Sequence, residues 1–354
     1  MGEKEIKLKE INFDTPIDLI INNNKIPLKF QHCNFENYIP NKEYPSQQEV
    51  KERLITFVKS LEEYNKSKCC ETIVKRLFKK NSKPKNIYID GGFGVGKTHL
   101  LSSIGNAYSG KSIFVSFSEL MYLIAYFNLL PLVEKMSQFD VVLLDEFELD
   151  DPGDAMMGIN FIREISNTDT VVVTTSNTTP VALGGRKFDL MLFKERIGKF
   201  VNYFNTYAID GKDYRVTKAP KTEYDSSKKT LKDLFNEYET KNRKKLYVSF
   251  DELINKMKEI HPARYVNFNE NIDAIFIENL RKFTDDELLD ALRFTYLIDI
   301  LYYGSVDIFI STDIQLWDMF SEDLKDGKFK NKIMRCLSRI SEKGVFVKTH
   351  DIDS

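Results

Sequence analysis

The chain has 354 residues, of which 42% are hydrophobic and 29% charged, and its formal net charge is −2. This length allows two packed units, and the balanced charge is not that of a protein that coats duplex DNA. The sequence has no run of roughly 18 uninterrupted apolar residues, as a membrane helix requires, and its first residues lack the apolar centre of a targeting signal. We therefore expect a cytoplasmic protein that is not integral to a membrane.

The first part of the chain gives the weakest structural signal. Residues 1–45 are rich in asparagine and interrupted by prolines, and we interpret them as an N-terminal extension. Ser46 and Glu49 then have the spacing of a capping box, which predicts the start of a helix. An apolar stripe continues this helix at Val50, Leu54, Phe57, Val58 and Leu61.

Short apolar runs alternate with helical stretches in the next part of the chain. These runs are at 86–90, 112–117, 140–145, 170–176 and 201–209. Runs this uniformly apolar are typical of strands that are covered on both faces, as in parallel sheets with crossover helices. Ser116 and Glu119 form a second capping box after one of the runs. The pattern predicts an α/β fold with a doubly wound parallel sheet.

A polar, lysine-rich stretch at 217–230 marks a domain boundary. The expected division is therefore an N-terminal extension, an α/β core over 46–218, and a mainly helical C-terminal lid domain over 219–354.

Within the C-terminal part, capping boxes begin at Ser249 and Thr284, and the alternating run 306–310 predicts one short strand. The lysine runs at 79–85 and 241–245 separate periodic segments, and we expect them to be solvated loops.

A glycine-rich segment, GGFGVGKT at residues 91–98, lies between a predicted strand and a predicted helix. This context predicts a phosphate-binding loop, because glycines allow backbone N–H groups to turn toward phosphate oxygens and the helix adds its positive end. Lys97 is expected to reach the β- and γ-phosphates, and the Thr98 hydroxyl to bind Mg²⁺. The candidate residues for binding ATP are Gly91, Gly92, Phe93, Gly94, Val95, Gly96, Lys97, Thr98 and His99.

Polar residues follow the two later apolar strands. In VVLLDEF, Asp145 ends a strand and Glu146 follows it, so Asp145 is the expected metal ligand and Glu146 the residue that orients the attacking water. Asn177 ends TVVVTTSN and is expected beside this acidic pair, where its amide can hydrogen-bond the water or the γ-phosphate. Arg196 lies further along and is the candidate for an arginine supplied to a neighbouring subunit.

This order of elements indicates a P-loop AAA+ ATPase core with a helical lid. The chain has no NKxD motif, which argues against a GTPase, and no LSGGQ-type segment, which argues against a transporter ATPase.

Several further motifs resemble those of one AAA+ family, that of the bacterial cell-division ATPase ZapE and its mitochondrial relatives. The resemblance extends from about Gln47 to Lys343. The matching segments are DEFELDDPGDAM (145–156), TSNTTP (175–180), KERIGK (194–199), Asp213-Tyr214-Arg215, LRFTYLIDILYYGSVDIFIS (292–311) and RCLSRISEK (335–343). The segment SFSELM (116–121) departs from the family pattern and is more similar to replication ATPases of the helicase-loader type.

The resemblance implies a Mg²⁺-dependent ATPase that self-associates into an oligomer or ring and acts on a protein client. Two alternatives remain open. The first is a nucleic-acid-associated AAA+ protein of the helicase-loader or initiator type, and the second is a nucleotide-gated interaction module with little turnover. The lid arginine that senses the nucleotide is also open, among Arg215, Arg293 and Arg339.

Overall fold

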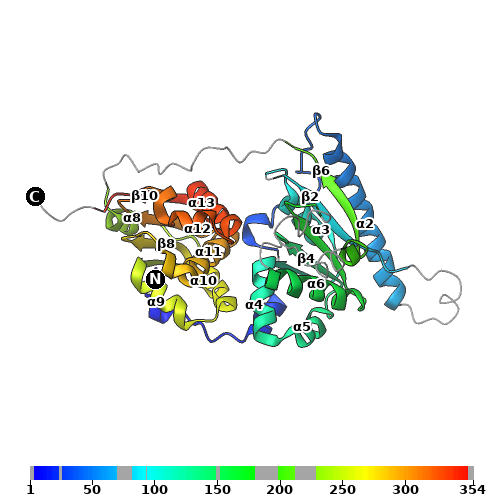
Figure 1. The fold of residues 1–354 in the computed structure, drawn as a ribbon, viewed down its shortest axis with the longest axis horizontal. Helices are drawn as coiled ribbons and strands as arrows, with labels where there is room; N and C mark the ends of the chain where they lie inside the picture. The colour runs from blue at the N-terminus through cyan, green and yellow to red at the C-terminus, as the bar shows by residue number, and fades with distance from the viewer. Residues whose placement is uncertain are drawn as a thin grey trace, which may run out of the picture. The chain divides into compact units, whose positions relative to one another are not determined.

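The computed structural model describes residues 4–23, 26–69, 82–92, 94–148, 152–179, 198–211 and 229–349 (Figure 1). The chain divides into two compact units. Asn22–Val216 form one, which we call the central unit. Met1–Ile21 and Thr217–Ser354 together form the other, which we call the terminal unit.

The central unit is built on a five-stranded parallel sheet with the strand order β3-β4-β5-β2-β6. Its strands are β2 (Asn86–Gly91), β3 (Ser112–Ser116), β4 (Val141–Asp145), β5 (Val171–Ser176) and β6 (Phe204–Ile209). All residues of β4 and β5 are buried, as the apolar runs predicted. The five predicted strands agree with these bounds to within three residues at each end.

Helices cover both faces of this sheet. They are α2 (Pro45–Cys69), α3 (Lys97–Ala107), α4 (Phe117–Phe127), α5 (Leu129–Met136) and α6 (Pro152–Ser166). The chain crosses from β2 to β3 in one direction and then returns through β4 to β5. Because such crossovers are right-handed, α3 lies on one face and α4, α5 and α6 on the other, and the contacts among the helices agree. The predicted doubly wound sheet is confirmed.

Two predicted helix starts have different outcomes. Ser116 accepts a hydrogen bond from the Glu119 backbone N–H at 3.2 Å, as the capping box predicted. The helix predicted from Ser46 begins one residue earlier, and the Ser46 hydroxyl instead accepts from the Asp210 N–H at 2.9 Å. The Ser46 hydroxyl, which the local spacing predicted to cap the helix, therefore bonds to a residue 164 positions away in the sequence.

The terminal unit contains a second five-stranded parallel sheet, with the order β1-β7-β8-β9-β10. The strands are β1 (Glu5–Ile6), β7 (Lys244–Ser249), β8 (Ile272–Glu278), β9 (Asp307–Ser311) and β10 (Gly344–Val347). From the sequence we expected a mainly helical lid domain with one strand, close to β9. Helical residues still outnumber strand residues, but the sheet organises the unit.

The helices of the terminal unit are distributed unevenly. They are α8 (Leu231–Glu237), α9 (Phe250–Glu259), α10 (Val266–Asn271), α11 (Leu288–Tyr303), α12 (Glu322–Asp326) and α13 (Lys330–Lys343). The strands β7 to β10 follow each other in chain order, so right-handed crossovers place their connecting helices on one face. The capping box predicted at Thr284 forms and opens a short 3-10 helix just before α11. At Ser249 the serine hydroxyl accepts from the Glu252 N–H, which is one half of the predicted box.

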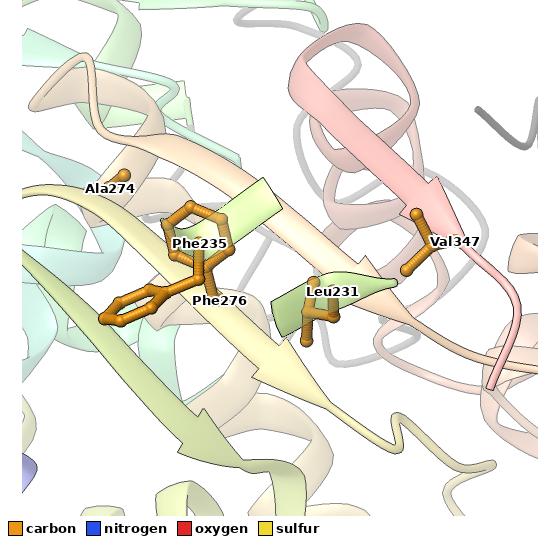
Figure 2. Packing of buried hydrophobic residues seen from close by; sticks show 5 residues of the cluster. All are labelled: Leu231, Phe235, Ala274, Phe276 and Val347. Carbon is orange, nitrogen blue, oxygen red and sulfur yellow. The ribbon is translucent and has the colours of Figure 1, made fainter. Parts of the chain in front are cut away.

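The opposite face of this sheet packs against α8. Leu231 and Phe235 of α8 form a buried cluster with Ala274 and Phe276 of β8 and with Val347 of β10 (Figure 2). The ring of Phe276 also stacks on that of Phe309 with centroids 4.3 Å apart. A helix of only seven residues is thus held by large aromatic contacts rather than by its own length.

The lysine run at 241–245 is not the solvated loop that we expected. Lys244 and Lys245 begin β7, and Lys245 is buried with its ammonium donating to the Phe235 carbonyl. Arg243 forms an ion pair with the buried Asp273 at 2.8 Å. These two cations have partners within the fold because they lie among neighbouring elements. The local charge pattern does not reveal this.

The expected N-terminal extension is divided between the two units. Residues 4–21 pack within the terminal unit, where β1 pairs with β7 through Glu5 opposite Lys245 and Ile6 opposite Leu246. Phe13 is buried and contacts the ring of Phe268 with centroids 5.1 Å apart. The central unit is therefore inserted in the sequence between two parts of the terminal unit.

Replacing Phe13 with alanine should destabilise the terminal unit. Loss of a buried phenylalanine ring lowers the free energy of unfolding by about 3 kcal/mol. Leu19→Ala in the same segment is the matched control, because the Leu19 side chain is 51% exposed. Thermal unfolding followed by circular dichroism should show the loss for Phe13→Ala alone. Equal melting of both variants would mean that the first residues are a dispensable extension.

Candidate nucleotide-binding site

The glycine-rich segment forms a tight loop between β2 and α3. Gly94 and Gly96 have φ angles of 78° and 87°, in the left-handed region that favours glycine. Gly96 also precedes the first turn of α3 without a side-chain cap, so the helix N-terminus opens onto the loop. Phe93 lies outside the described residues. This geometry suits an anion, because backbone N–H groups and the helix end supply partial positive charge.

Lys97 spans this loop. Its side chain is largely buried, and its ammonium donates to the carbonyl oxygens of Gly91 at 2.7 Å and Gly92 at 2.6 Å. It also donates to the Asn177 side-chain oxygen at 2.9 Å. These three acceptors are uncharged. A phosphate oxygen would bind the ammonium more strongly than they do, because attraction between opposite charges is added to the hydrogen bond.

Thr98 and Asp145, the two predicted metal ligands, lie in direct contact. The Thr98 hydroxyl is 3.1 and 3.0 Å from the two carboxylate oxygens of Asp145, and Asp145 is fully buried at the end of β4. The Thr175 hydroxyl of β5 also donates to this carboxylate. A buried carboxylate beside a hydroxyl provides the oxygen ligands that Mg²⁺ prefers.

Glu146 has an unusual backbone conformation. Its φ angle is 58°, in the left-handed region that few non-glycine residues occupy. Thr175 holds it there, because the Glu146 N–H donates to the Thr175 hydroxyl at 3.0 Å and the Phe147 N–H to the Thr175 carbonyl at 2.7 Å. Phe147 is fully buried and stacks on Phe200. Functional sites often contain a strained backbone conformation of this kind that is maintained by surrounding contacts.

Asn177 directly follows β5, as predicted, and its side chain connects two other side chains of the site. Its amide oxygen accepts from Lys97 and its amide nitrogen donates to Glu148. We did not select Glu148 from the sequence, although it lies within the acidic segment that follows β4. Asn177 thus links the lysine of the loop to the acidic segment.

The His99 ring contacts the chain that precedes the core. Its Nε2 lies 3.1 Å from the Asn34 carbonyl and 2.8 Å from the Asn37 side-chain oxygen, both of which precede the core. Burial lowers the pKa of His99 below its usual value. The first turn of α3 is therefore attached to residues 34 and 37 through this ring.

The candidate arginines are only partly described. Arg196 and Arg215 lie outside the described residues. Arg339 is buried in the terminal unit, where it forms an ion pair with Asp299 and stacks over two tyrosines. Arg293 forms an ion pair with Asp290 at 3.2 Å.

Asp90 is a buried carboxyl group that the sequence patterns did not indicate. It lies at the end of β2, immediately before the loop, and is only 4% exposed. Within the described residues its Oδ1 has no hydrogen-bond partner. Burial raises the pKa of Asp90, Lys97 opposes this rise, and Asp210 adds to it.

The sequence matches the AFG1-like ATPase family over residues 36–246 and 237–345. The chain belongs to the AFG1-like ATPase family. The matched residues include the glycine-rich loop, the acidic segment and most of the terminal unit. The resemblance noted from the motifs is confirmed, since ZapE belongs to this family. A P-loop AAA+ core and nucleotide binding are properties that membership implies.

Several solved structures are similar to part of the chain. The DnaC helicase loader is 16% identical with a TM-score of 0.38, over 51% of this chain and 99% of that one. DnaI is 18% identical with a TM-score of 0.37, over 56% and 99%. AMPPCP-bound DnaA from Aquifex aeolicus is 17% identical with a TM-score of 0.36, over 52% and 51%. This chain therefore spans about half the length of that DnaA chain. In addition, no helix among the described residues is long and apolar enough to cross a membrane.

Asp90→Asn should stabilise the protein at neutral pH. A carboxyl group whose pKa is raised by folding is easier to ionise in the unfolded state, so ionisation lowers stability as pH rises through the folded pKa. The amide removes this effect, so the variant should melt at a higher temperature than the wild type. Thermal melts should show the gain at pH 7 and a smaller gain near pH 4. Asp318→Asn, at an exposed position, is the control, and an equal gain in both variants would exclude a specific role of burial.

Proposed function

We propose that this protein binds ATP with Mg²⁺ in the loop between β2 and α3 and hydrolyses it. The observation that carries the proposal is the contact of Thr98 and Thr175 with the buried carboxylate of Asp145, beside the Lys97–Asn177 pair. Groups from three strand ends converge there. Family membership supports the same activity.

Each residue has a distinct role in this proposal. Lys97 and the N–H groups of the loop would bind the phosphates. Thr98 and Asp145 would hold the magnesium ion, which when bound neutralises charge on the phosphate oxygens. Glu146 would orient a water molecule and accept its proton. Asn177 would position the Lys97 ammonium and the end of β5, because it already bonds to both Lys97 and Glu148.

We further propose that the ATPase acts on a protein client. The described members of the two lysine runs support this over nucleic-acid binding, because several have partners within the fold. Lys83 donates to the carbonyls of Ser166 and Thr168, and Lys245 is buried. Cations held in this way contribute less to contacts with a phosphate backbone. The buried free cysteines Cys33 and Cys336 are consistent with a reducing compartment such as the cytoplasm.

Lys97→Ala should abolish nucleotide binding, because it removes the cation that would contact the phosphates. Glu146→Gln should bind ATP but hydrolyse it at least a hundredfold more slowly, because an amide cannot accept the proton of the water. The controls are Lys59→Ala and Glu239→Gln, which make the same changes at exposed positions. Phosphate release and binding of a fluorescent ADP analogue are measured with the full chain. Unchanged affinity in Lys97→Ala would contradict the loop assignment. Wild-type turnover in Glu146→Gln would contradict the role of that carboxylate.

The same assay separates the two classes of partner. We expect a turnover rate that single-stranded DNA does not change at 50 or 200 mM salt. Salt-sensitive stimulation by DNA would support the helicase-loader type of function instead, because phosphate contacts weaken steeply with salt.

We also propose that copies of the chain associate and that Arg196 completes the site of a neighbouring copy. The support is its place in the sequence, between β5 and β6 and within a segment that resembles the family's arginine motif. Arg196→Ala should bind ATP normally and lose about 10³-fold or more in turnover, whereas Arg163→Ala, with an exposed side chain, should not. Mixing Arg196→Ala with Glu146→Gln should restore some activity, because a few interfaces would then pair both intact residues. No recovery, together with turnover per molecule that is independent of protein concentration, would place the complete site within one chain.

A further inference from the structure

The chain that precedes the core lies against the phosphate-binding loop. We call residues 34–47 the strap. We propose that the strap holds this loop in its binding conformation and that Tyr38 is the positioning residue. The inference rests on the proposed function, since it concerns how the same loop is prepared for a nucleotide.

Tyr38 touches two consecutive residues of the loop. It is 6% exposed, and its hydroxyl donates to the Val95 carbonyl at 3.0 Å. Its ring fills the space beside Gly96, where an added Cβ would come within 2.6 Å of the ring. One side chain therefore fixes the direction of a loop carbonyl and also packs against the left-handed glycine that follows it.

A second attachment is made through the first turn of α3. His99 bonds to Asn34 and Asn37, and its ring lies 5.5 Å from that of Tyr38. Asn34 and Asn37 also brace each other, because the N–H of each donates to the side-chain oxygen of the other at 2.9 and 2.8 Å. The Lys51 ammonium donates to the Tyr38 carbonyl at 3.0 Å. The strap is therefore fixed just before Tyr38 and at the Tyr38 carbonyl.

A third contact joins the strap to the chain that follows β6, which also packs against the loop. Gln47 donates to the Asp210 carbonyl at 2.8 Å and accepts from the Asn41 N–H at 2.8 Å. Gly211 approaches Val95 so closely that an added Cβ would lie 2.4 Å from the valine side chain. Val95 is consequently held between the Tyr38 hydroxyl and the chain that follows β6.

This enclosure has an energetic consequence for binding. Without the Tyr38 hydroxyl, the buried Val95 carbonyl loses its partner and the loop can adopt other conformations. Nucleotide binding must then order the loop, and this ordering reduces affinity. Burial raises the pKa of Tyr38 to about 12, so the hydroxyl keeps its proton and the effect should not vary between pH 6 and pH 9.

Tyr38→Phe isolates the hydroxyl, because the ring remains beside Gly96. We expect the Kd for a fluorescent ADP analogue, measured with the full chain, to rise about threefold to tenfold, the range of one net hydrogen bond. In turnover assays the KM for ATP should rise with little change in kcat, since Tyr38 does not touch the acidic pair. Tyr38→Ala should bind more weakly still.

Tyr64→Phe is the matched control. It also removes one hydroxyl hydrogen bond, to Asp169 at 3.0 Å, but near the C-terminal end of α2 and away from the loop. It should leave the Kd unchanged. Amide hydrogen exchange should also show that nucleotide protects residues 34–47 in the wild type and protects them less in Tyr38→Phe.

The outcomes separate this inference from the proposed function. Equal Kd values for wild type, Tyr38→Phe and Tyr64→Phe would overturn the role of the strap while leaving the nucleotide site intact. If both variants lose the same amount of thermal stability but only Tyr38→Phe loses affinity, the positioning role is supported over a general structural one. A wild-type chain that binds no nucleotide would contradict the proposed function itself.

Discussion

The buried carboxylate of Asp145 is the constraint on which the site depends. It lies at the end of a fully buried strand and accepts hydrogen bonds from Thr98 and Thr175, which belong to two other elements. A charge at this depth is tolerated only with such partners, so it fixes the start of α3 against the ends of β4 and β5. The same threonine of β5 also holds Glu146 in its left-handed conformation. The residues proposed to bind the metal and to orient the water are therefore linked through one pair of strand ends.

Sheet topology supplies the rest of this arrangement. In the order β3-β4-β5-β2-β6, the strands that carry Asp145, Asn177 and the loop are consecutive neighbours. Parallel strands present their carboxyl ends at one edge, which is where open α/β sheets bind ligands. The terminal unit uses the same parallel pairing, but its strands follow chain order and its crossover helices gather on one face. Two sheets of five parallel strands thus differ in how their faces are covered, and α8 packs on the face opposite the crossover helices.

The first 47 residues show how tertiary contacts give a role to a segment with weak local signals. Part of this segment adds β1 to the terminal sheet, and part forms the strap over the phosphate-binding loop. Tyr38 and Phe13 follow no periodic pattern in the sequence. Their partners lie 57 and 255 residues away, at Val95 and Phe268, so no short window of sequence contains either contact.

The sequence by itself determined the five strands of the central sheet, the glycine-rich loop and the acidic pair, because each depends on residues close together in the chain. Continuous apolar runs specify buried parallel strands, and glycines at fixed spacing permit the left-handed turn. The family resemblance also followed from contiguous motifs. Only the tertiary structure decided the sheet of the terminal unit, the partners of Asn177 and His99, and the burial of Lys245. These depend on which distant surfaces meet, and a polar or charged side chain carries no local sign of whether water or another residue will satisfy it.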